Sequence, residues 1–183
     1  MHTKIYNYYN IDIDSISRKV IRAKALLINS NKEILLGYSH DTYQFIGGHI
    51  EEEEDLVKGL IREIEEESGI IIDDEEVIPF LKVTKYVKDY PNINENSCYD
   101  YYYYYIKTDK LPNLELVNYT DNEKEGNFKL VYIPLDEVEE VFKDNQKVSE
   151  RVKTIALENL EAMEYFKKSS FSHEIWFFSY NVI

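Results

Sequence analysis

Three glutamates at helical spacing are the residues of this sequence best suited to chemistry. Glu63, Glu66 and Glu67 stand at positions i, i+3 and i+4, so in a helix their carboxylates share one face. Crowded carboxylates repel one another unless a cation lies between them, and their oxygens suit a hard ion such as Mg²⁺ or Mn²⁺. The alternative is an acidic helix face that is simply solvated.

The segment that carries these glutamates has the pattern of a helix packed on a sheet. Between Asp55 and Ser68 only Gly59 disfavours a helix. Gly59 lies four positions before Glu63, where the missing side chain leaves room for another group to approach. Beside the acidic face, apolar residues recur at helical intervals, at Leu56, Val57, Leu60, Ile61 and Ile64.

A glycine pair lies before this helix. Gly47 and Gly48 directly follow Thr42–Ile46, a short segment with strand character. Because glycine has no Cβ, the backbone at this point can approach a metal ion or a phosphate closely. A plain tight turn is the alternative interpretation.

The spacing of these residues resembles the signature of the Nudix hydrolases, G-x5-E-x7-R-E-U-x-E-E-x-G-U, in which U is aliphatic. Every fixed position is filled, by Gly48, Glu54, Arg62, Glu63, Ile64, Glu66, Glu67, Gly69 and Ile70. Two neighbouring positions depart from the family: Ile46 stands where Pro is usual, and Glu53 stands where Gly is common. Both departures affect the shape of the loop, and neither removes a ligand.

The resemblance implies a fold and an activity. The fold class is α/β, a Nudix-type α/β/α sandwich with a mixed β-sheet, in which the motif forms a loop–helix–loop. The activity is cleavage of a phosphoanhydride bond in a nucleoside diphosphate linked to another moiety, by metal-assisted attack of water with Mg²⁺ or Mn²⁺. We expect a nucleoside triphosphate or a dinucleoside polyphosphate as the substrate.

The resemblance also implies roles for the motif residues. The expected metal ligands are three carboxylates and one backbone carbonyl, from Glu63, Glu66, Glu67 and Gly47. Arg62 is expected to clamp the glutamates, because its planar fork can hold two carboxylate oxygens at once. Glu54 is then either the partner of Arg62 or a water-bridged outer ligand of the metal.

One more carboxylate is expected from a late loop that precedes a strand. Glu123 and Glu125 both fall in this loop. We prefer Glu125 as an additional catalytic and metal-binding residue, because a Glu-Gly step before a strand resembles the arrangement in Nudix triphosphatases. A solvated surface glutamate is the alternative.

Basic and aromatic residues around the motif are candidates for binding substrate. Tyr86 stands where a tyrosine is associated with Nudix enzymes that act on dinucleoside polyphosphates, and Gly48 leaves room for substrate. The run Tyr101–Tyr105 alternates faces in a strand, so some of its rings could stack on a base, although a half-buried strand explains the run equally well. Candidate phosphate contacts on the flanking strands are Arg22, Lys24, Lys82 and Lys85.

Composition restricts the partners and the compartment. The formal charge of −14, from 35 acidic and 21 basic residues, lacks the basic footprint of a nucleic-acid-binding protein. Cys98 is the only cysteine, which fits a reducing cytoplasm. The N-terminus has no apolar signal region and no apolar run approaches membrane-spanning length, so we expect no membrane association.

We expect one domain over residues 1–183, beginning with an arm or strands within residues 1–19. The expected strands are Val20–Asn29, Lys32–Tyr38, Thr42–Ile46, Ile70–Ile72, Val77–Tyr90, Ser97–Lys107 and Phe128–Ile133. Helices are expected at Leu135–Phe142 and Val148–Lys167 besides the one in the motif. The hydrophobic tail, residues 171–183, either covers the core or builds a homodimer.

Two other functions are weighed against hydrolysis. A non-catalytic Nudix module that senses a nucleotide metabolite tends to carry damaged motif carboxylates or an added DNA-binding domain, and this sequence shows neither. A Nudix-like isomerase of isopentenyl diphosphate uses a cysteine on the N-terminal side of the motif, whereas Cys98 lies beyond it.

Overall fold

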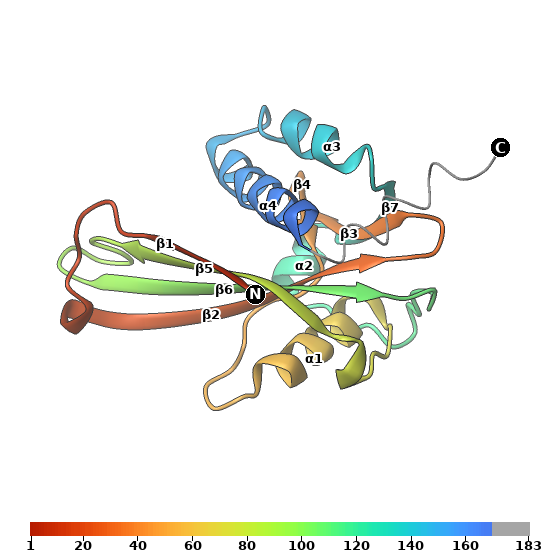
Figure 1. Ribbon diagram of the computed structural model, residues 1–183, viewed down its shortest axis with the longest axis horizontal. Coiled ribbons are helices and arrows are strands. Elements are labelled where there is room, and N and C mark those ends of the chain that lie inside the picture. The colour runs from red at the N-terminus through yellow and green to blue at the C-terminus, as the bar shows by residue number, and fades with distance from the viewer. Residues whose placement is uncertain (170–183) are drawn as a thin grey trace.

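A mixed β-sheet of seven strands forms the centre of the computed structural model, which describes residues 1–169 (Figure 1). The strands are β1 (His2–Tyr6), β2 (Ile16–Ile28), β3 (Glu33–Ser39), β4 (Thr42–Phe45), β5 (Ile78–Val87), β6 (Asn96–Lys107) and β7 (Lys129–Pro134). The α-helices are α1 (Leu56–Ser68), α2 (Asp121–Glu125), α3 (Val138–Asn145) and α4 (Glu150–Lys168). Two short 3₁₀ turns span Ile13–Ser15 and Asp74–Glu76.

Parallel and antiparallel pairs are combined in this sheet. Its strand order is β1-β5-β6-β2-β3-β4, and β7 pairs with β3. The long central strands β2 and β6 run parallel, while β2 with β3 and β5 with β6 run antiparallel. The mixed sheet with helices confirms the expected α/β fold class, and the consecutive strands β2 and β3 form an antiparallel hairpin.

The two faces of the sheet bury separate apolar clusters. In β2, Leu26 points to one face and joins a cluster that includes Phe166 of α4. The next residue, Leu27, points to the opposite face and joins a cluster that includes Leu60 and Ile64 of α1. The strand is therefore buried on both sides, and α1 lies across the sheet from α3 and α4 (Figure 1).

Local sequence signals define both ends of α1. The Asp55 side chain accepts hydrogen bonds from the backbone N–H groups of Val57 and Lys58, which caps the start of the helix. Gly69 ends it with φ of 67°, a left-handed conformation that glycine adopts without steric cost. The expected helix over residues 55–68 is thus confirmed.

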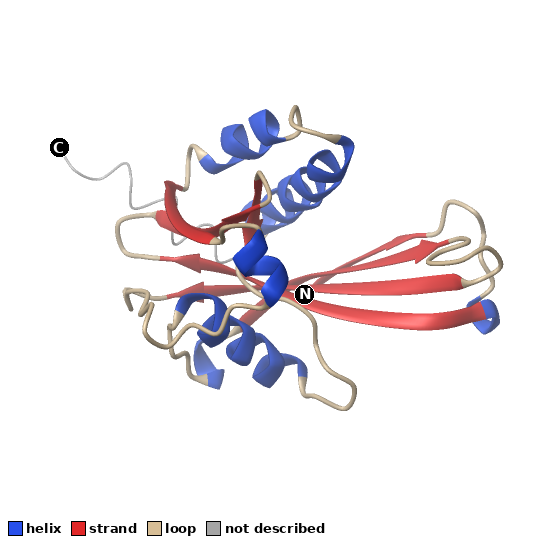
Figure 2. Cartoon of the chain, turned by 180° about the vertical axis from the view of Figure 1, so that it is seen from behind, coloured by secondary structure: helices blue, strands red, loops and turns tan. Residues whose placement is uncertain are grey.

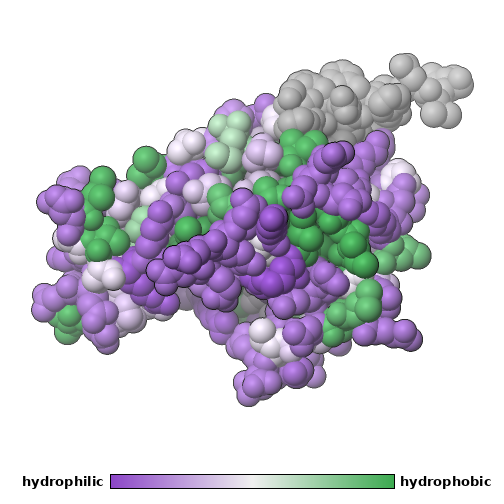
Figure 3. Space-filling model, turned by 90° about the horizontal axis from the view of Figure 1, so that it is seen from below, coloured by the Kyte–Doolittle hydropathy of each residue, from purple (hydrophilic) through white to green (hydrophobic). Residues whose placement is uncertain are grey.

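Viewed from the α1 side, the molecule presents a mostly hydrophilic surface (Figure 3).

Two segments differ from the sequence-based expectation. Ile70–Ile72 is not a strand, because Ile70 and Ile72 are buried against α1 without a neighbouring strand to pair with. Residues 1–19 hold β1, a 3₁₀ turn and the start of β2 at Ile16, which agrees with the strands expected there. The helix α2 was not expected; it is short and lies between α1 and the layer of α3 and α4 (Figure 2). The tail 171–183 lies outside the described residues.

Within residues 1–169, no helix combines the length and the apolar character needed to cross a membrane.

Candidate functional site

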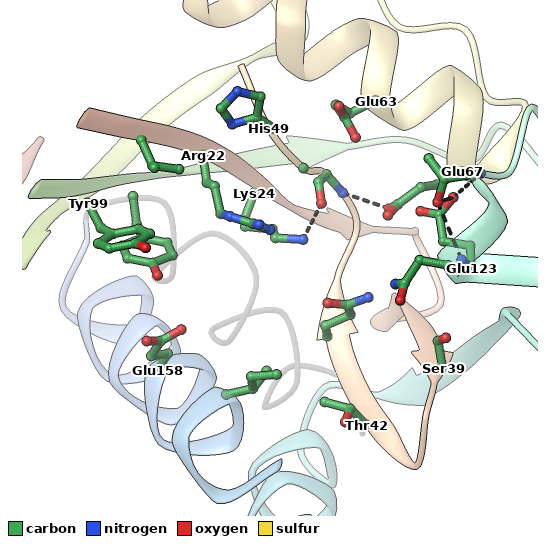
Figure 4. A pocket seen from close by; sticks show the side chains of 18 of the residues that line it. Arg22, Lys24, Ser39, Thr42, His49, Glu63, Glu67, Tyr99, Glu123 and Glu158 are labelled. Atoms are coloured by element: carbon green, nitrogen blue, oxygen red, sulfur yellow. Dashed lines mark hydrogen bonds between the residues drawn. The ribbon is translucent and has the colours of Figure 1, made fainter. Parts of the chain in front are cut away.

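A pocket of about 790 Å³ opens on the sheet face that carries α4. Its walls come from β2 and β6, from the loop with the glycine pair, from the second half of α1, from the segment around α2 and from α4. The motif glutamates Glu63, Glu66 and Glu67 line one end of it. Figure 4 shows how side chains from these elements converge on the cavity.

The three motif glutamates differ in their exposure to solvent. Glu67 is only 5% exposed, and its Oε2 accepts a hydrogen bond of 2.8 Å from the backbone N–H of Gly47. Burial raises the pKa of Glu67 to about 8, although the nearby Lys24 ammonium acts in the opposite direction. Burial also raises the pKa of Glu63, whereas Glu66 lies at the more open side of the cluster. Burial therefore disfavours the charged form of both Glu63 and Glu67, and a nearby cation offsets that effect.

Arg62 holds the outer carboxylates together. Its Nε and Nη2 atoms donate to the two oxygens of Glu54, at 2.9 and 3.0 Å. Its Nη1 donates to Glu63 at 2.8 Å and to Glu66 at 2.9 Å. These hydrogen bonds raise the pKa of Arg62 above its usual range and lower the pKa of Glu54. The structure thus pairs Arg62 with Glu54 and places it as a clamp on two of the three motif glutamates.

Glycines permit close packing around this cluster. A Cβ on Gly48 would lie 2.1 Å from Oε2 of Glu63. Gly47 has φ of 122°, and a Cβ there would lie 2.4 Å from the carbonyl oxygen of Ala23. Gly59 leaves room for side chains of the preceding loop, since a Cβ would meet Ile50 and Glu54 at less than 3 Å. The gap expected at Gly59 therefore accommodates the loop.

The Lys24 side chain extends from β2 to the glycine loop. Its ammonium donates to the carbonyl oxygen of Gly47, and to that of Phe45 at 3.3 Å (Figure 4). Although part of the side chain faces the pocket, dense packing around the ammonium lowers the pKa of Lys24, while the carboxylate of Glu67 raises it. The backbone oxygen expected to bind a metal thus already accepts a hydrogen bond from a lysine.

Glu123, rather than Glu125, faces the pocket from the late loop. Glu123 lines the cavity, whereas Glu125 is exposed and lies outside its lining. A capping box at the start of α2 fixes this choice: the carboxylate of Glu123 accepts hydrogen bonds from the backbone N–H of Thr120 at 2.6 Å and from its hydroxyl at 2.8 Å. The Thr-x-x-Glu spacing is the sequence signal that identifies this turn.

Three arginines and a row of tyrosines line the other end of the pocket. Arg18 and Arg22 extend from β2 and Arg151 from α4. In the described part of the chain, none of these three guanidinium groups makes an ion pair or a hydrogen bond. Side chains on the same face of β6, in register with this stretch of β2, supply Tyr99, Tyr101 and Tyr103. Arg22, Tyr101 and Tyr103 were among the candidates expected from the sequence, whereas Arg18 and Tyr99 were not, because the face that they occupy depends on strand register.

Two other predicted substrate contacts lie away from the pocket lining. Lys85 forms an ion pair of 2.5 Å with Glu158 of α4. Tyr86 is in register with Cys98, so it points to the sheet face opposite Tyr99 and Tyr101. The structure therefore brings together the motif residues, Arg22 and Gly48, holds Lys85 against the lining residues Glu158 and Tyr101, and places Tyr86 on the opposite face of the sheet.

The carboxylates suit a hard cation in their chemistry, but groups of the chain itself already bind them. Over residues 1–169, no three His, Cys, Asp or Glu side chains lie close enough together to hold a metal ion. The guanidinium of Arg62 donates hydrogen bonds to Glu63 and Glu66, and the backbone N–H of Gly47 donates one to Glu67. Two inward-facing carboxylates with raised pKa values nevertheless form a donor set of the kind that Mg²⁺ prefers.

Comparison with known proteins identifies the fold and the domain type. A family model described as a NUDIX domain matches residues 18–154. A mutator MutT protein from Bacillus halodurans is 19% identical in sequence and superimposes with a TM-score of 0.50, over 66% of this chain and 72% of that one. A MutT NUDIX hydrolase from Burkholderia pseudomallei is 18% identical, with a TM-score of 0.49 over 66% and 86% of the two chains. No curated protein sequence matches the chain.

Proposed function

The chain belongs to the Nudix family, and from that premise we propose that it hydrolyses a phosphoanhydride bond of a nucleoside diphosphate linked to another group, using Mg²⁺ or Mn²⁺. A nucleoside triphosphate or a dinucleoside polyphosphate is the proposed substrate. The observation that carries this proposal is that one pocket has motif carboxylates at one end and three unpaired arginines at the other.

The carboxylate end of the pocket is the proposed reaction centre. Glu63, Glu66 and Glu67 would hold the divalent ion, and Glu123 takes the supporting role first assigned to Glu125, because Glu123 faces the pocket. A bound Mg²⁺ or Mn²⁺ supplies charge neutralisation for the pyrophosphate and lowers the pKa of an attacking water. The carbonyl of Gly47 is left out of this ligand set because Lys24 donates to it.

Residues of the chain itself orient these groups. Arg62 fixes the rotamers of Glu63 and Glu66 through hydrogen bonds from a single Nη1 atom. Glu54 in turn holds Arg62 with both of its oxygens. This pre-organisation keeps the carboxylates in one geometry, which matters because a displacement of about 1 Å can slow a reaction about 100-fold.

The arginine end of the pocket is the proposed binding region for the remainder of the substrate. Arg18 and Lys24 lie six positions apart on β2, a distance of about 20 Å along an extended strand. In a chain with a net charge of −14, unpaired guanidinium groups in a pocket favour an anionic ligand. The rings of Tyr99 and Tyr101, whose centroids are 6.3 Å apart, offer flat surfaces for a nucleobase.

The proposal is tested by measuring phosphate and pyrophosphate release from a substrate panel. The panel contains nucleoside triphosphates, dinucleoside polyphosphates, ADP-ribose, nucleotide sugars and NADH, each with Mg²⁺ or Mn²⁺. We expect turnover of one class by the wild-type protein and none by Glu67→Gln. Undiminished turnover by Glu67→Gln contradicts the proposed centre, and tight nucleotide binding without any turnover favours the sensing function.

A matched pair of variants tests the arginine end. Arg151→Gln removes a pocket arginine of α4, and we expect it to raise KM about tenfold with a small effect on kcat. Lys153→Gln removes an exposed cation from the same helix outside the pocket and serves as the control. Equal KM values for the two variants contradict the assignment of Arg151.

A further inference from the structure

Lys24 is placed where a cation-binding position would be expected. The carbonyl oxygens of Gly47 and Phe45 both accept hydrogen bonds from its ammonium. The backbone N–H of the same Gly47 donates to the buried carboxylate of Glu67. Gly47 therefore contacts Lys24 through its carbonyl and Glu67 through its amide. Figure 4 shows Lys24, the glycine loop and Glu67 in a single line of hydrogen bonds.

The backbone holds the lysine in this position. The N–H of Ala23 donates to the carbonyl of Gly48 at 3.1 Å, and the N–H of Ala25 donates to the carbonyl of Ile46 at 2.8 Å. The glycine loop is therefore bonded to β2 on both sides of Lys24. Because alternate residues of a strand point to opposite faces, Lys24 projects into the pocket between these two bonds, next to the carbonyl of Gly47.

Two basic side chains, Arg62 and Lys24, act on different carboxylates of the cluster. Arg62 forms ion pairs with Glu54, Glu63 and Glu66, and within the described residues no ion pair joins it to Glu67. The strongest charge–charge effect on Glu67 comes instead from Lys24. A divalent ion bound to the carbonyl of Gly47 would have to lie next to this ammonium, and two positive charges at that separation repel each other strongly.

We propose that the Lys24 ammonium is the resident cation of the inner position, at the carbonyl of Gly47 and beside Glu67, and that it excludes a divalent ion from that position. Divalent ions are then confined to the outer carboxylates, Glu63 and Glu66, and to the free oxygen of Glu67. This inference rests on the proposed function, since it concerns how many ions the same site holds.

Mn²⁺ binding measures the effect without any need for a substrate. The signal of free Mn²⁺ in electron paramagnetic resonance gives the number of ions bound by the wild-type protein and by Lys24→Met. Methionine has similar length and no charge, so it vacates the inner position while still filling the space. We expect Lys24→Met to bind one Mn²⁺ more per chain than the wild-type protein.

Three further variants make the result specific. Arg22→Met removes a cation two residues away on the same face of β2, and we expect it to keep the wild-type number of ions. Lys24→Arg retains the charge, and we also expect the wild-type number. Lys24→Gln is a second neutral variant, to be used if Lys24→Met fails to give a cooperative thermal unfolding transition.

The outcomes separate this inference from the proposed function. Equal ion numbers for the wild-type protein and both neutral variants overturn the role of Lys24, even when the wild-type enzyme is active. An extra ion in Arg22→Met also overturns it, because loss of any nearby charge would then suffice. One ion in Lys24→Met and none in the wild-type protein supports the inference and contradicts metal-dependent hydrolysis by the native chain.

Discussion

Replacing Gly48 with alanine should damage the reaction centre with little damage to the fold. The new Cβ would lie 2.1 Å from Oε2 and 2.7 Å from Cδ of Glu63. Non-bonded carbon atoms prefer separations of about 3.5 Å, so the Glu63 carboxylate must move by about 1 Å or more. Because a displacement of that size can cost about 100-fold in rate, we expect kcat/KM to fall about 100-fold, which corresponds to about 2.7 kcal/mol.

The stability effect of the same substitution should be small. Gly48 is not among the residues with positive φ, so alanine is compatible with its backbone. The clashing atoms belong to the end of a flexible side chain, which can move aside with the loss of its hydrogen bond to Arg62. Because solvent screens this ion pair at the Arg62 side chain, which is 33% exposed, a change in the free energy of unfolding below about 1 kcal/mol is expected from urea unfolding.

A double-mutant cycle shows whether the loss passes through Glu63. The rate of substrate hydrolysis is measured for Gly48→Ala, Glu63→Ala and the double variant. If the clash with Glu63 is the cause, adding Gly48→Ala to Glu63→Ala has almost no further effect. A second 100-fold loss in the Glu63→Ala background refutes the reasoning.

Four other substitutions have expected outcomes. Arg62→Lys should lower stability by about 1–2 kcal/mol in urea unfolding and reduce kcat, because an ammonium cannot replace the fork that bonds three carboxylates; unchanged kcat contradicts the clamp. Glu53 has φ of 67°, so Glu53→Gly should raise stability by about 0.5–1 kcal/mol, while the neighbouring Glu52→Gly should not. Without divalent ions, the wild-type protein should lose stability as pH rises from about 4.5 to about 8, because a carboxyl whose pKa is raised by folding penalises the folded state once it ionises. Glu67→Gln should not show this loss, so between pH 5 and pH 8 the wild-type protein should lose on the order of a few kcal/mol more stability than the variant. Parallel pH profiles of the two proteins in urea unfolding contradict the raised pKa of Glu67.

Elements with strong local signals could be predicted from the sequence. The helix α1 has an apolar stripe, the cap Asp55 and the terminating Gly69, all within the segment itself. The spacing of Glu63, Glu66 and Glu67 likewise fixes their common face, because helix geometry alone decides it. The family motif and the long strands β2 and β6 followed from the same kind of local pattern.

Features that depend on packing between distant segments could not be predicted. Ile70 and Ile72 looked like a strand because they are apolar, but burial against α1 accounts for them without any pairing. The choice between Glu123 and Glu125 depends on one helical turn, and the position of Lys24 depends on hydrogen bonds between β2 and the glycine loop. Strand register similarly decides which tyrosines of β6 face the pocket.

The dependence of the hydrolysis rate on divalent ions tests the central claim most directly. The substrate identified by the panel is incubated with the wild-type protein in the presence of a chelator, and Mg²⁺ is then added in steps, with Glu66→Gln treated in parallel. The account predicts no turnover with chelator, saturable recovery with Mg²⁺, and a weaker apparent Mg²⁺ affinity for Glu66→Gln. Full turnover in chelator, or identical Mg²⁺ curves for the two proteins, would contradict metal-assisted hydrolysis at these carboxylates.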